Sequence, residues 1–405
     1  MAERPESAPD GGGSAQQGAG RPEVAAGPSG ARVLSTLFAS ITGVGIMLGL
    51  STPLFSVVLD RMGLNASMVG LNTSVGVGAT LVAAPLVPWL LKRVDAVSLM
   101  IGGIVVSAVG LVAAGFLQSA ALWFLIRFMI GVGIALHWVI SETWINHVAH
   151  DERRAFIAGL YSALMGLGFA VGPVILGLTG SEGVLPFALS AVLVLIAGLP
   201  LLWVRGARPA MDHQPGQTTL GVLALAPVIM FASVISGFVD TATIALLPVY
   251  GLRVGMDEYT AVLQLTVATV GAVVLQLPIG WLGDRFGRRQ VLGGCAAVKT
   301  VTVAALPLVL DMPWLLWPIL FLWGGAMVAF YTLALALMGS RFRGNLLAKA
   351  TAALVITYCV GSVIGPLVIG GAMDWFGPGG FIAGMALISL LLTIVVAVRL
   401  RAERF

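Results

Sequence analysis

The chain has 405 residues, of which 58% are hydrophobic and only 10% are charged, with a formal net charge of +4. Soluble domains carry about 25% charged residues, so this composition excludes an ordinary soluble protein and indicates a surface that mostly faces lipid. The positive charges lie in short loops between apolar spans and form no aromatic-interleaved patch, which excludes a nucleic-acid-binding protein.

Residues 1–31 precede the first apolar span and are rich in glycine, alanine, proline and serine. They lack an apolar core, so they do not resemble a signal peptide, and their composition is typical of a disordered cytosolic tail. Twelve spans follow, each apolar and long enough to cross a bilayer as an α-helix. Their predicted ranges are 33–59, 67–91, 96–118, 120–141, 155–178, 185–204, 220–247, 260–283, 290–310, 314–338, 348–371 and 380–398.

The longest connection, residues 205–219, divides the spans into two groups of six. Two sequence markers recur about 193 residues apart. Pro88–Arg93 in the second span corresponds to Gly280–Arg285 in the eighth, and the Gly-x3-Gly-Pro motif ending at Pro173 corresponds to one ending at Pro366. We therefore predict a duplication with an N-terminal six-helix bundle at 32–204, a cytosolic linker at 205–219 and a C-terminal six-helix bundle at 220–400. Because six is even, both halves enter the membrane in the same direction, as parallel repeats.

The basic residues are divided unequally between the two sides of the predicted bundle. Of the 22 lysines and arginines, Arg61 and Arg253 fall at span ends on one side, and Arg127 and Lys299 fall inside spans. The others lie in the termini and in the loops on the opposite side. Positively charged loops remain cytosolic. We expect a multi-pass protein of the bacterial inner (plasma) membrane with both termini in the cytosol.

Three motifs carry a resemblance to a known family. Gly280–Arg289 reads G-W-L-G-D-R-F-G-R-R and is similar to a G-x-x-x-D-R-x-G-R-R signature. Arg127–Gly133 in the fourth span is similar to R-x-x-Q-G-x-G, with Ile130 in place of glutamine. The fifth span, from Gly159 to Gly177, resembles the G-x8-G-x3-G-P-x2-G-G pattern of drug–proton antiporters, with Leu176 in place of one glycine. Over about residues 32–400 the chain thus resembles the major facilitator superfamily of secondary transporters.

This resemblance implies an all-α membrane protein with twelve transmembrane helices arranged as two parallel six-helix repeats. It also implies alternating access and a central cavity lined by helices 1, 4, 7 and 10. The stretch around Glu142, Thr143 and Trp144 is similar to an uncharacterised YcaD-like branch.

The resemblance further implies a gating motif that holds one conformation at the cytosolic face. Its residues are Gly280, Gly283, Asp284, Arg285, Gly287, Arg288 and Arg289. The alternative is a basic loop that only anchors the chain on the cytosolic side. In the copy between the second and third spans, Pro88 replaces the first glycine, Lys92 the acid and Asp95 a later glycine, which puts gating by that copy in doubt.

Two charged residues fall well inside spans that would line the cavity. Arg127 lies about seven residues from the outer edge of the fourth span, and Asp240 lies at a similar predicted depth in the seventh. Charges at such depth are costly unless they face a cavity or a partner. We expect Asp240 to bind the coupling proton and Arg127 to be its alternating partner or a substrate contact. The alternatives are a static ion pair, and a hydrogen bond from Arg127 to the first span near Ser51 and Thr52.

Trp138 and Glu142 in the fourth span and Tyr331 in the tenth complete the expected substrate and proton-coupling site. Trp138 and Tyr331 lie about 193 residues apart, at equivalent positions of the repeat. Paired aromatic side chains facing a cavity suit an apolar or cationic substrate, and packing or a membrane-interface position is the alternative. Lys299 lies about ten residues into the ninth span and either snorkels or pairs inward.

Glycine–proline segments recur in the fifth and eleventh spans, where they permit close packing and bending. The resemblance implies that these helices pack across the interface between the halves, so a rocking hinge and packing alone are both open. The residues are Gly168, Gly172, Pro173, Gly361, Gly365 and Pro366. Histidines and acids at residues 147–152 are loosely spaced, and we expect a solvated loop there and no metal site.

We expect an inner-membrane secondary transporter that exports a small organic solute in exchange for protons. The sequence holds no zinc-protease, serine-hydrolase or P-loop motif, so neither an enzyme nor a cofactor other than the proton gradient is expected. The expected partners are the substrate, protons and the lipid bilayer, with the protein as a monomer. The alternatives are a proton symporter or facilitator for a polar metabolite, and a non-transporting membrane sensor or scaffold.

Overall fold

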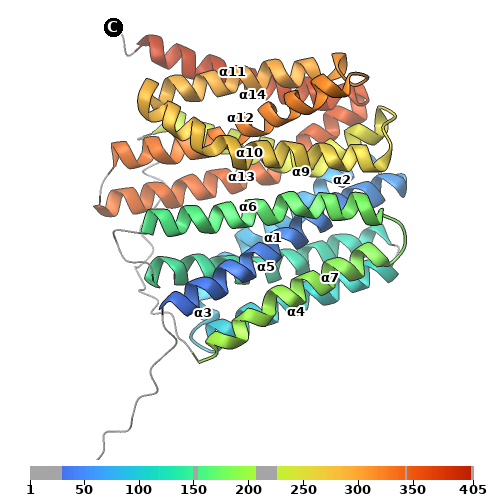
Figure 1. Ribbon diagram of the computed structural model, residues 1–405, viewed down its shortest axis with the longest axis vertical. Coiled ribbons are helices and arrows are strands. Elements are labelled where there is room, and N and C mark those ends of the chain that lie inside the picture. Colours follow the sequence, from blue (N-terminus) through green and yellow to red (C-terminus); the bar gives the residue numbers. More distant parts are fainter. Residues whose placement is uncertain (1–29, 118, 149–153, 207–225, 343, 403–405) are drawn as a thin grey trace, which may run out of the picture.

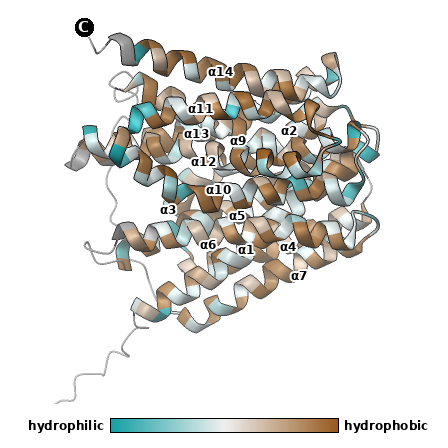
Figure 2. Cartoon of the chain, turned by 45° about the horizontal axis from the view of Figure 1, so that its top comes forward, coloured by the Kyte–Doolittle hydropathy of each residue, from teal (hydrophilic) through white to brown (hydrophobic). Residues whose placement is uncertain are grey.

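The computed structural model describes residues 30–117, 119–148, 154–206, 226–342 and 344–402, and these residues form helices and short connections. Twelve helical spans in this part of the chain are long and apolar enough to cross a membrane. They lie side by side along one common direction (Figure 1). Hydrophobic residues cover much of their length, and many of the most hydrophilic residues lie near the helix ends (Figure 2). The predicted all-α, twelve-span fold is confirmed.

The first six spans comprise α1 (Gly30–Arg61), α2 (Ala66–Ala83), α3 (Val87–Leu90), α4 (Ala96–Phe116), α5 (Ala120–Val148), α6 (Arg154–Thr179) and α7 (Leu185–Gly198). The last six comprise α9 (Pro227–Arg253), α10 (Glu258–Phe286), α11 (Arg288–Ala305), α12 (Pro313–Arg341), α13 (Gly344–Phe376) and α14 (Gly379–Ala402). A 3-10 turn at Ala84–Leu86 joins α2 to α3 within the second span, and 3-10 turns at Leu199–Val204 and Leu306–Leu308 extend α7 and α11. We call the end of the bundle where α1 begins and α14 ends the terminal face, and the other end the opposite face.

Helix packing repeats between the two groups of spans. Helix α1 packs against α6, α2 against α5, and α4 against α7; correspondingly, α9 packs against α13, α10 against α12, and α11 against α14. Two contacts between the groups also correspond, α2 with α13 and α6 with α10. This is the arrangement that a duplicated six-helix unit produces when its copies face one another. The predicted linker falls mostly outside the described residues, so the domain boundaries stay predictions, as does the tail over residues 1–29.

Side-chain caps begin three of the helices. The side chain of Asn65 accepts from the Met68 amide at the start of α2, Asp95 from Ser98 at the start of α4, and Asp257 from Thr260 at the start of α10. In the altered copy of the gating motif, Asp95 therefore works as a helix cap. Hydrogen bonds from Ser98 hold the pKa of the Asp95 carboxyl below its ordinary value.

The recurring glycines bring helices of the same group into close contact. A Cβ at Gly172 would overlap the backbone of α1 at Gly49, and a Cβ at Gly365 would overlap the backbone of α9 at Phe238. Gly168 and Gly361 approach α1 and α9 in the same way. Helices α6 and α13 do contact the other group, but through other residues, so close packing within each group accounts for these glycines. The hinge role, which includes Pro173 and Pro366 inside the two helices, stays a prediction.

The seventh span differs most from its predicted range. Residues 220–225 lie outside the described part, and α9 continues past Leu247 to Arg253. Pro248 lies inside the helix, where the neighbours Leu247 and Val249 are fully buried. Proline removes one backbone hydrogen bond, and in a membrane bundle the surrounding helices can compensate for that loss. Helix α5 is also longer than predicted and ends at Val148.

Candidate functional site

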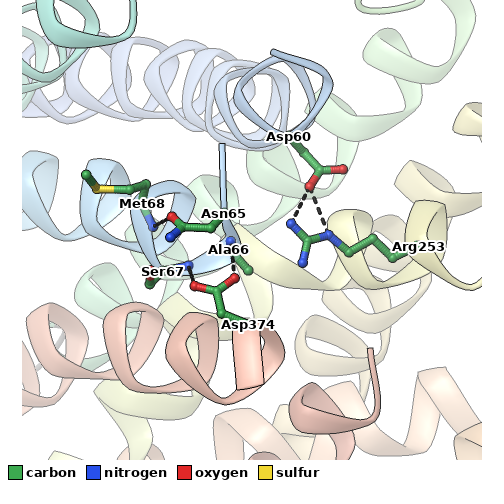
Figure 3. Close-up of polar contacts among 7 residues, drawn as sticks. All are labelled: Asp60, Asn65, Ala66, Ser67, Met68, Arg253 and Asp374. Carbon is green, nitrogen blue, oxygen red and sulfur yellow. Dashed lines mark hydrogen bonds and ion pairs between the residues drawn. The ribbon is translucent and has the colours of Figure 1, made fainter. Parts of the chain in front are cut away.

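Polar contacts join the two groups of spans at the opposite face. Arg253, the last residue of α9, donates from Nε and Nη2 to Oδ1 of Asp60 in α1, at 2.9 and 2.7 Å (Figure 3). Arg253 follows Asp60 by 193 residues in the chain, the offset of the repeat, so equivalent positions carry opposite charges. A second ion pair links Arg61 of α1 to Glu258 of α10 at 2.5 Å.

A carboxylate at the same face caps a helix of the other group. Asp374, near the end of α13, accepts from the backbone amides of Ala66 and Ser67 at 2.6 and 2.9 Å (Figure 3). These amides belong to the first turn of α2, where the helix dipole favours an anion. Together with the ion pairs, this contact closes the opposite face.

The gating motif lies at the terminal face, where Asp284 and Arg288 interact with residues of the last six spans. Arg288, the first residue of α11, donates to Asp284 at 2.9 Å and to the Ala336 carbonyl oxygen of α12 at 2.7 Å. Gly287 has φ of 94°, a conformation that favours glycine, and joins α10 to α11. Arg285 lies over the rings of Trp281 and Phe286.

These motif residues border an open cavity of about 510 Å³. Its lining residues are Gly283, Asp284, Gly287, Arg288, Arg289, Gln290, Leu337 and Ser340. A Cβ at Gly283 would meet the Leu333 side chain of α12, whereas one at Gly280 would have nothing within 4 Å, so the structure gives no packing reason for Gly280. The structure thus brings most of the predicted motif together, and its use as a latch stays a prediction.

Arg127 interacts with the first span. It is 5% exposed, and its Nη2 donates to Thr52 Oγ1 of α1 at 3.1 Å. Its guanidinium lies 5.2 Å from the centre of the Phe55 ring, and its Nε makes no hydrogen bond. Arg127 thus forms the hydrogen bond to the first span that the sequence analysis gave as an alternative to a role in the cavity.

Asp240 has partners within the last six spans. Its Oδ2 accepts from the Tyr358 hydroxyl of α13 at 3.2 Å and from the Ser236 hydroxyl at 3.3 Å. Its Oδ1 is buried without a hydrogen bond. The remaining partner is Lys299 of α11, whose charge attracts the Asp240 carboxylate through the protein.

Lys299 points into the bundle and is fully buried. Its Nζ lies 5.1 Å from the centre of the Trp323 ring and 5.6 Å from that of Phe330, both in α12. Cation–π contacts of this kind compensate part of the cost of a buried ammonium. Nζ makes no hydrogen bond. Lys299 and Asp240 thus carry opposite charges in the interior of the same group of spans, and no ion pair joins them in the described part of the chain.

The structure does not form the predicted partnership between Arg127 and Asp240. Helix α9 runs to Arg253, so Asp240 lies about 13 residues, or roughly 20 Å, from the opposite face. Arg127 lies about seven residues, or roughly 10 Å, from the start of α5 at the same face. The predicted equal depth was wrong because the seventh span was ended at residue 247, whereas α9 continues to Arg253.

The remaining predicted site residues lie toward the terminal face. Glu142 is exposed near the end of α5, and its charge acts on Tyr161 of α6 and on Tyr331 of α12. Trp138 is half-buried one turn before Glu142 and interacts with it. The rings of Tyr331 and Tyr358 meet edge to face with centres 5.2 Å apart. Glu142 and Trp138 thus lie one turn apart on α5, Tyr331 contacts Tyr358 of the last six spans, and Arg127 lies nearer the opposite face.

Sequence reasoning missed Tyr358 as a partner of Asp240 and gave no partner to Lys299. One signal was available for Lys299: it and Asp240 are opposite charges deep in spans of the same half, and each needs a partner there. No such signal marks Tyr358, because a neutral tyrosine in a span does not itself require a charged partner.

Comparisons with known proteins agree with this architecture. The model of the Major Facilitator Superfamily matches residues 37–266 and 229–405. The chain is 27% identical over 348 residues to the uncharacterized MFS-type transporter YfkF of Bacillus subtilis, covering 82% of this chain and 86% of the relative. It is 27% identical over 310 residues to the uncharacterized MFS-type transporter YcaD of Escherichia fergusonii, covering 74% and 78%.

Two kinds of solved structure share the fold. The nucleoside transporter NupG superimposes with a TM-score of 0.75 at 14% identity, covering 91% of this chain and 98% of that one. A bacterial homolog to the human lysosomal transporter Spinster, in an inward-facing and unoccupied conformation, gives 0.72 at 16% identity, covering 93% and 97%. This multi-pass membrane protein is a transporter and belongs to the major facilitator superfamily.

Proposed function

We propose that this transporter exports a small organic solute across the bacterial inner membrane in exchange for protons, by alternating access and without an enzymatic step. The observation that carries the proposal is the buried pair of charges at Asp240 and Lys299. A carboxylate in the membrane interior is costly and is found at proton relays and substrate pathways. A transporter without a nucleotide site needs such a group to draw on the proton gradient.

Protonation of Asp240 supplies the coupling step. When ionised, the carboxylate attracts Lys299 and accepts from Tyr358 and Ser236. A proton on Asp240 removes the attraction for Lys299 and leaves its ammonium with only the rings of α12. Since the three side chains come from α9, α11 and α13, this loss weakens contacts among three helices and favours their rearrangement.

Membrane orientation relates this step to the two faces. Basic residues of the gating motif and of the α12 end lie at the terminal face, which we assign to the cytosol with both chain termini. The contacts of Asp60, Arg253 and Asp374 then close the outside. In this proposal, substrate enters the transporter from the cytosol while these contacts hold the outer side closed.

Proteoliposomes test the proposal. The purified protein would be reconstituted, a proton gradient imposed, and uptake of radiolabelled cationic, neutral and anionic organic solutes followed with and without a protonophore. We expect at least one solute to accumulate against its own gradient, and the protonophore to abolish that accumulation. Transport of solutes that is indifferent to the protonophore would identify a facilitator and overturn the proton-coupled mechanism.

A further inference from the structure

An arginine lies over the ring of an exposed tryptophan at the terminal-face end of the second span and again of the eighth. The guanidinium of Arg93 lies 4.1 Å from the centre of the Trp89 ring, and that of Arg285 lies 5.3 Å from the centre of the Trp281 ring. The two tryptophans are 50% and 57% exposed. The pairs occupy equivalent positions of the repeat, so the duplicated unit carries the same stacked pair twice.

These stacked pairs are a part of the gating motif that both copies retain. In the first copy, Pro88 replaces the first glycine, Leu91 the second glycine and Lys92 the acid, whereas the tryptophan and the arginine that stacks on it remain. A latch built on the acid and the glycines therefore does not explain the stacked pair of the first copy.

Exposed apolar side chains form a row that leads along each helix to its stacked pair. The members are Val270, Val274 and Leu277 in α10, and Val82 and Leu86 in the second span. In α10, spacings of three and four residues place the row and its tryptophan on one helix face. From Val270 to Trp281 the row is about 16 Å long, roughly the hydrocarbon thickness of one leaflet. An exposed apolar row of this length suits the acyl chain of a lipid, with the tryptophan at the level of the headgroup.

A guanidinium stacked on an indole ring can still bind a phosphate. Its N–H donors lie in its plane, so stacking occupies the flat face and leaves the edge for bidentate hydrogen bonds to phosphate oxygens. Arg93 and Arg285 are exposed, as is Lys92 beside the first pair. Asp284, the acid next to Arg285 in the chain, is paired with Arg288. Charge complementarity therefore favours an anionic phospholipid over a zwitterionic one.

We propose that each stacked pair binds the headgroup phosphate of an anionic phospholipid in the leaflet at the terminal face, with an acyl chain along the exposed row. This lipid site goes beyond the proposed transport function and does not depend on it. The alternative is that the tryptophans and arginines only fix the depth of the two helices in the membrane, without preference among headgroups.

Native mass spectrometry tests the proposal because it counts individual bound lipids. The purified protein would be titrated in detergent with phosphatidylglycerol and with phosphatidylcholine that carries the same acyl chains. We expect the wild type to bind two phosphatidylglycerol molecules about fivefold more tightly than phosphatidylcholine. Arg93→Gln and Arg285→Gln should each remove one of these two tight sites, and the double variant should remove both. Trp89→Leu/Trp281→Leu, which keeps both arginines, should weaken both sites.

Trp203 and Arg205 provide the matched control. Both are exposed at the terminal face, and in the described part of the chain no ring stacking joins them. Arg205→Gln should therefore keep both tight sites. Unchanged phosphatidylcholine binding in the variants separates loss of the headgroup contact from misfolding.

Two kinds of result would overturn the lipid site. One is equal binding of the two phospholipids by the wild type, or two tight sites retained in Arg93→Gln/Arg285→Gln. The other is displacement of the bound lipids by soluble glycerol phosphate, because the apolar rows would then contribute nothing. Since no transport is measured, none of these results bears on the proposed proton-coupled export.

Discussion

Asp240 and Lys299 bring opposite charges into the membrane interior from α9 and α11. Desolvation makes each charge costly, and their mutual attraction together with hydrogen bonds and aromatic contacts offsets part of that cost. One oxygen of Asp240 and the ammonium of Lys299 still lack hydrogen bonds. Under the proposed function, these unsatisfied groups are where one added proton would act.

Removal of one of the two charges should lower the free energy of unfolding more than removal of both. Lys299→Met leaves the Asp240 carboxylate without its counter-charge and should lower the free energy of unfolding by about 3 kcal/mol. The double variant Asp240→Asn/Lys299→Met should recover most of that loss, because no isolated charge remains. Denaturant unfolding in nanodiscs measures both. Additive losses in the double variant would show that the two residues do not interact.

The cap at Asp95 gives a prediction for pH dependence. Asp95→Ala removes the cap of α4 and should lower the free energy of unfolding by about 0.5–1 kcal/mol at pH 7. Since folding lowers the pKa of Asp95, the charged carboxylate stabilises the protein above its ordinary pKa of 3.8, and this contribution is lost as the pH falls through the folded value.

Thermal unfolding of wild type and Asp95→Ala at pH 7 and pH 3 measures this effect. The difference between the two proteins should shrink at the lower pH. A difference that is the same at both values would mean that the charge of Asp95 contributes nothing to the cap.

The sequence shows which charged residues lie inside the predicted spans, but not which of them interact with one another. Pairing depends on helix rotation, and an apolar span that is buried on several sides carries little periodic signal. For Arg127, a cavity position and a hydrogen bond near Thr52 were both open, and the structure forms the hydrogen bond. Lys299 looked peripheral because α11 is an outer helix, yet its side chain points inward and is fully buried.

At the scale of helices, each group of spans contains one closely packed helix pair. The pair is α1 with α6 in the first group and α9 with α13 in the second. Their backbones approach closely because glycine lies at the contact, at Gly172 in one pair and Gly365 in the other. Without a hydrophobic driving force between helices in lipid, such close packing is a main source of helix association.

A methyl group at this contact should separate the helices. Gly172→Ala should destabilise the protein by about 1–3 kcal/mol. The new Cβ overlaps backbone atoms of α1, which cannot move aside as the end of a flexible side chain could. Gly159→Ala is the matched control on the same helix, since nothing lies within 4 Å of its added Cβ. Thermal unfolding in detergent compares the two. Equal stability of both variants would contradict the packing role of Gly172.

The predicted helix boundaries match the structure closely in some spans and differ by several residues in others, as at the end of α5. The third span was predicted at 96–118 and α4 covers Ala96–Phe116. The seventh was ended at Leu247, whereas α9 passes through Pro248 to Arg253. Proline ends helices in water more strictly than in a membrane bundle, where neighbouring helices satisfy the freed carbonyl. That error moved Asp240 about 9 Å toward the opposite face.

For the whole molecule, the arrangement of polar contacts defines the state of the transporter. Asp60, Arg253 and Asp374 join the two groups at the opposite face. At the terminal face, the contacts of Asp284 and Arg288 stay within the last six spans, and Glu142 is exposed. In the described part of the chain, these contacts therefore join the two groups of spans at the opposite face.

Loss of the Asp60–Arg253 pair should shift the population toward a state open at the opposite face. Both side chains are mostly buried, so Arg253→Gln should favour that state about fivefold. Spin labels would be placed at the exposed positions Glu182 and Asp311, with both native cysteines replaced by serine. Double electron–electron resonance would then measure the distance between the two groups of spans at the opposite face. Arg253→Gln should add longer distances, and the exchanged pair Asp60→Arg/Arg253→Asp should remove them. An unchanged distribution in Arg253→Gln would exclude this pair as a closing contact.

The duplication was visible in the sequence because motifs at the helix ends survive in both halves. The contact between Asp60 and Arg253 was not predicted, although the two residues share the repeat offset, because pairing across the interface depends on which face of the bundle is closed. Glu142, Trp138 and Tyr331 were selected from the sequence by depth and chemistry, which do not determine how α5 lies relative to α12.

One measurement tests the central claim that Asp240 couples transport to protons. Asp240→Asn would be compared with Asp311→Asn, an exposed acid in a loop, in proteoliposomes that measure both gradient-driven accumulation and exchange of labelled for unlabelled solute at equal pH. Because exchange needs no net proton movement, Asp240→Asn should retain exchange and lose accumulation, while Asp311→Asn retains both. Full gradient-driven accumulation by Asp240→Asn would contradict the account.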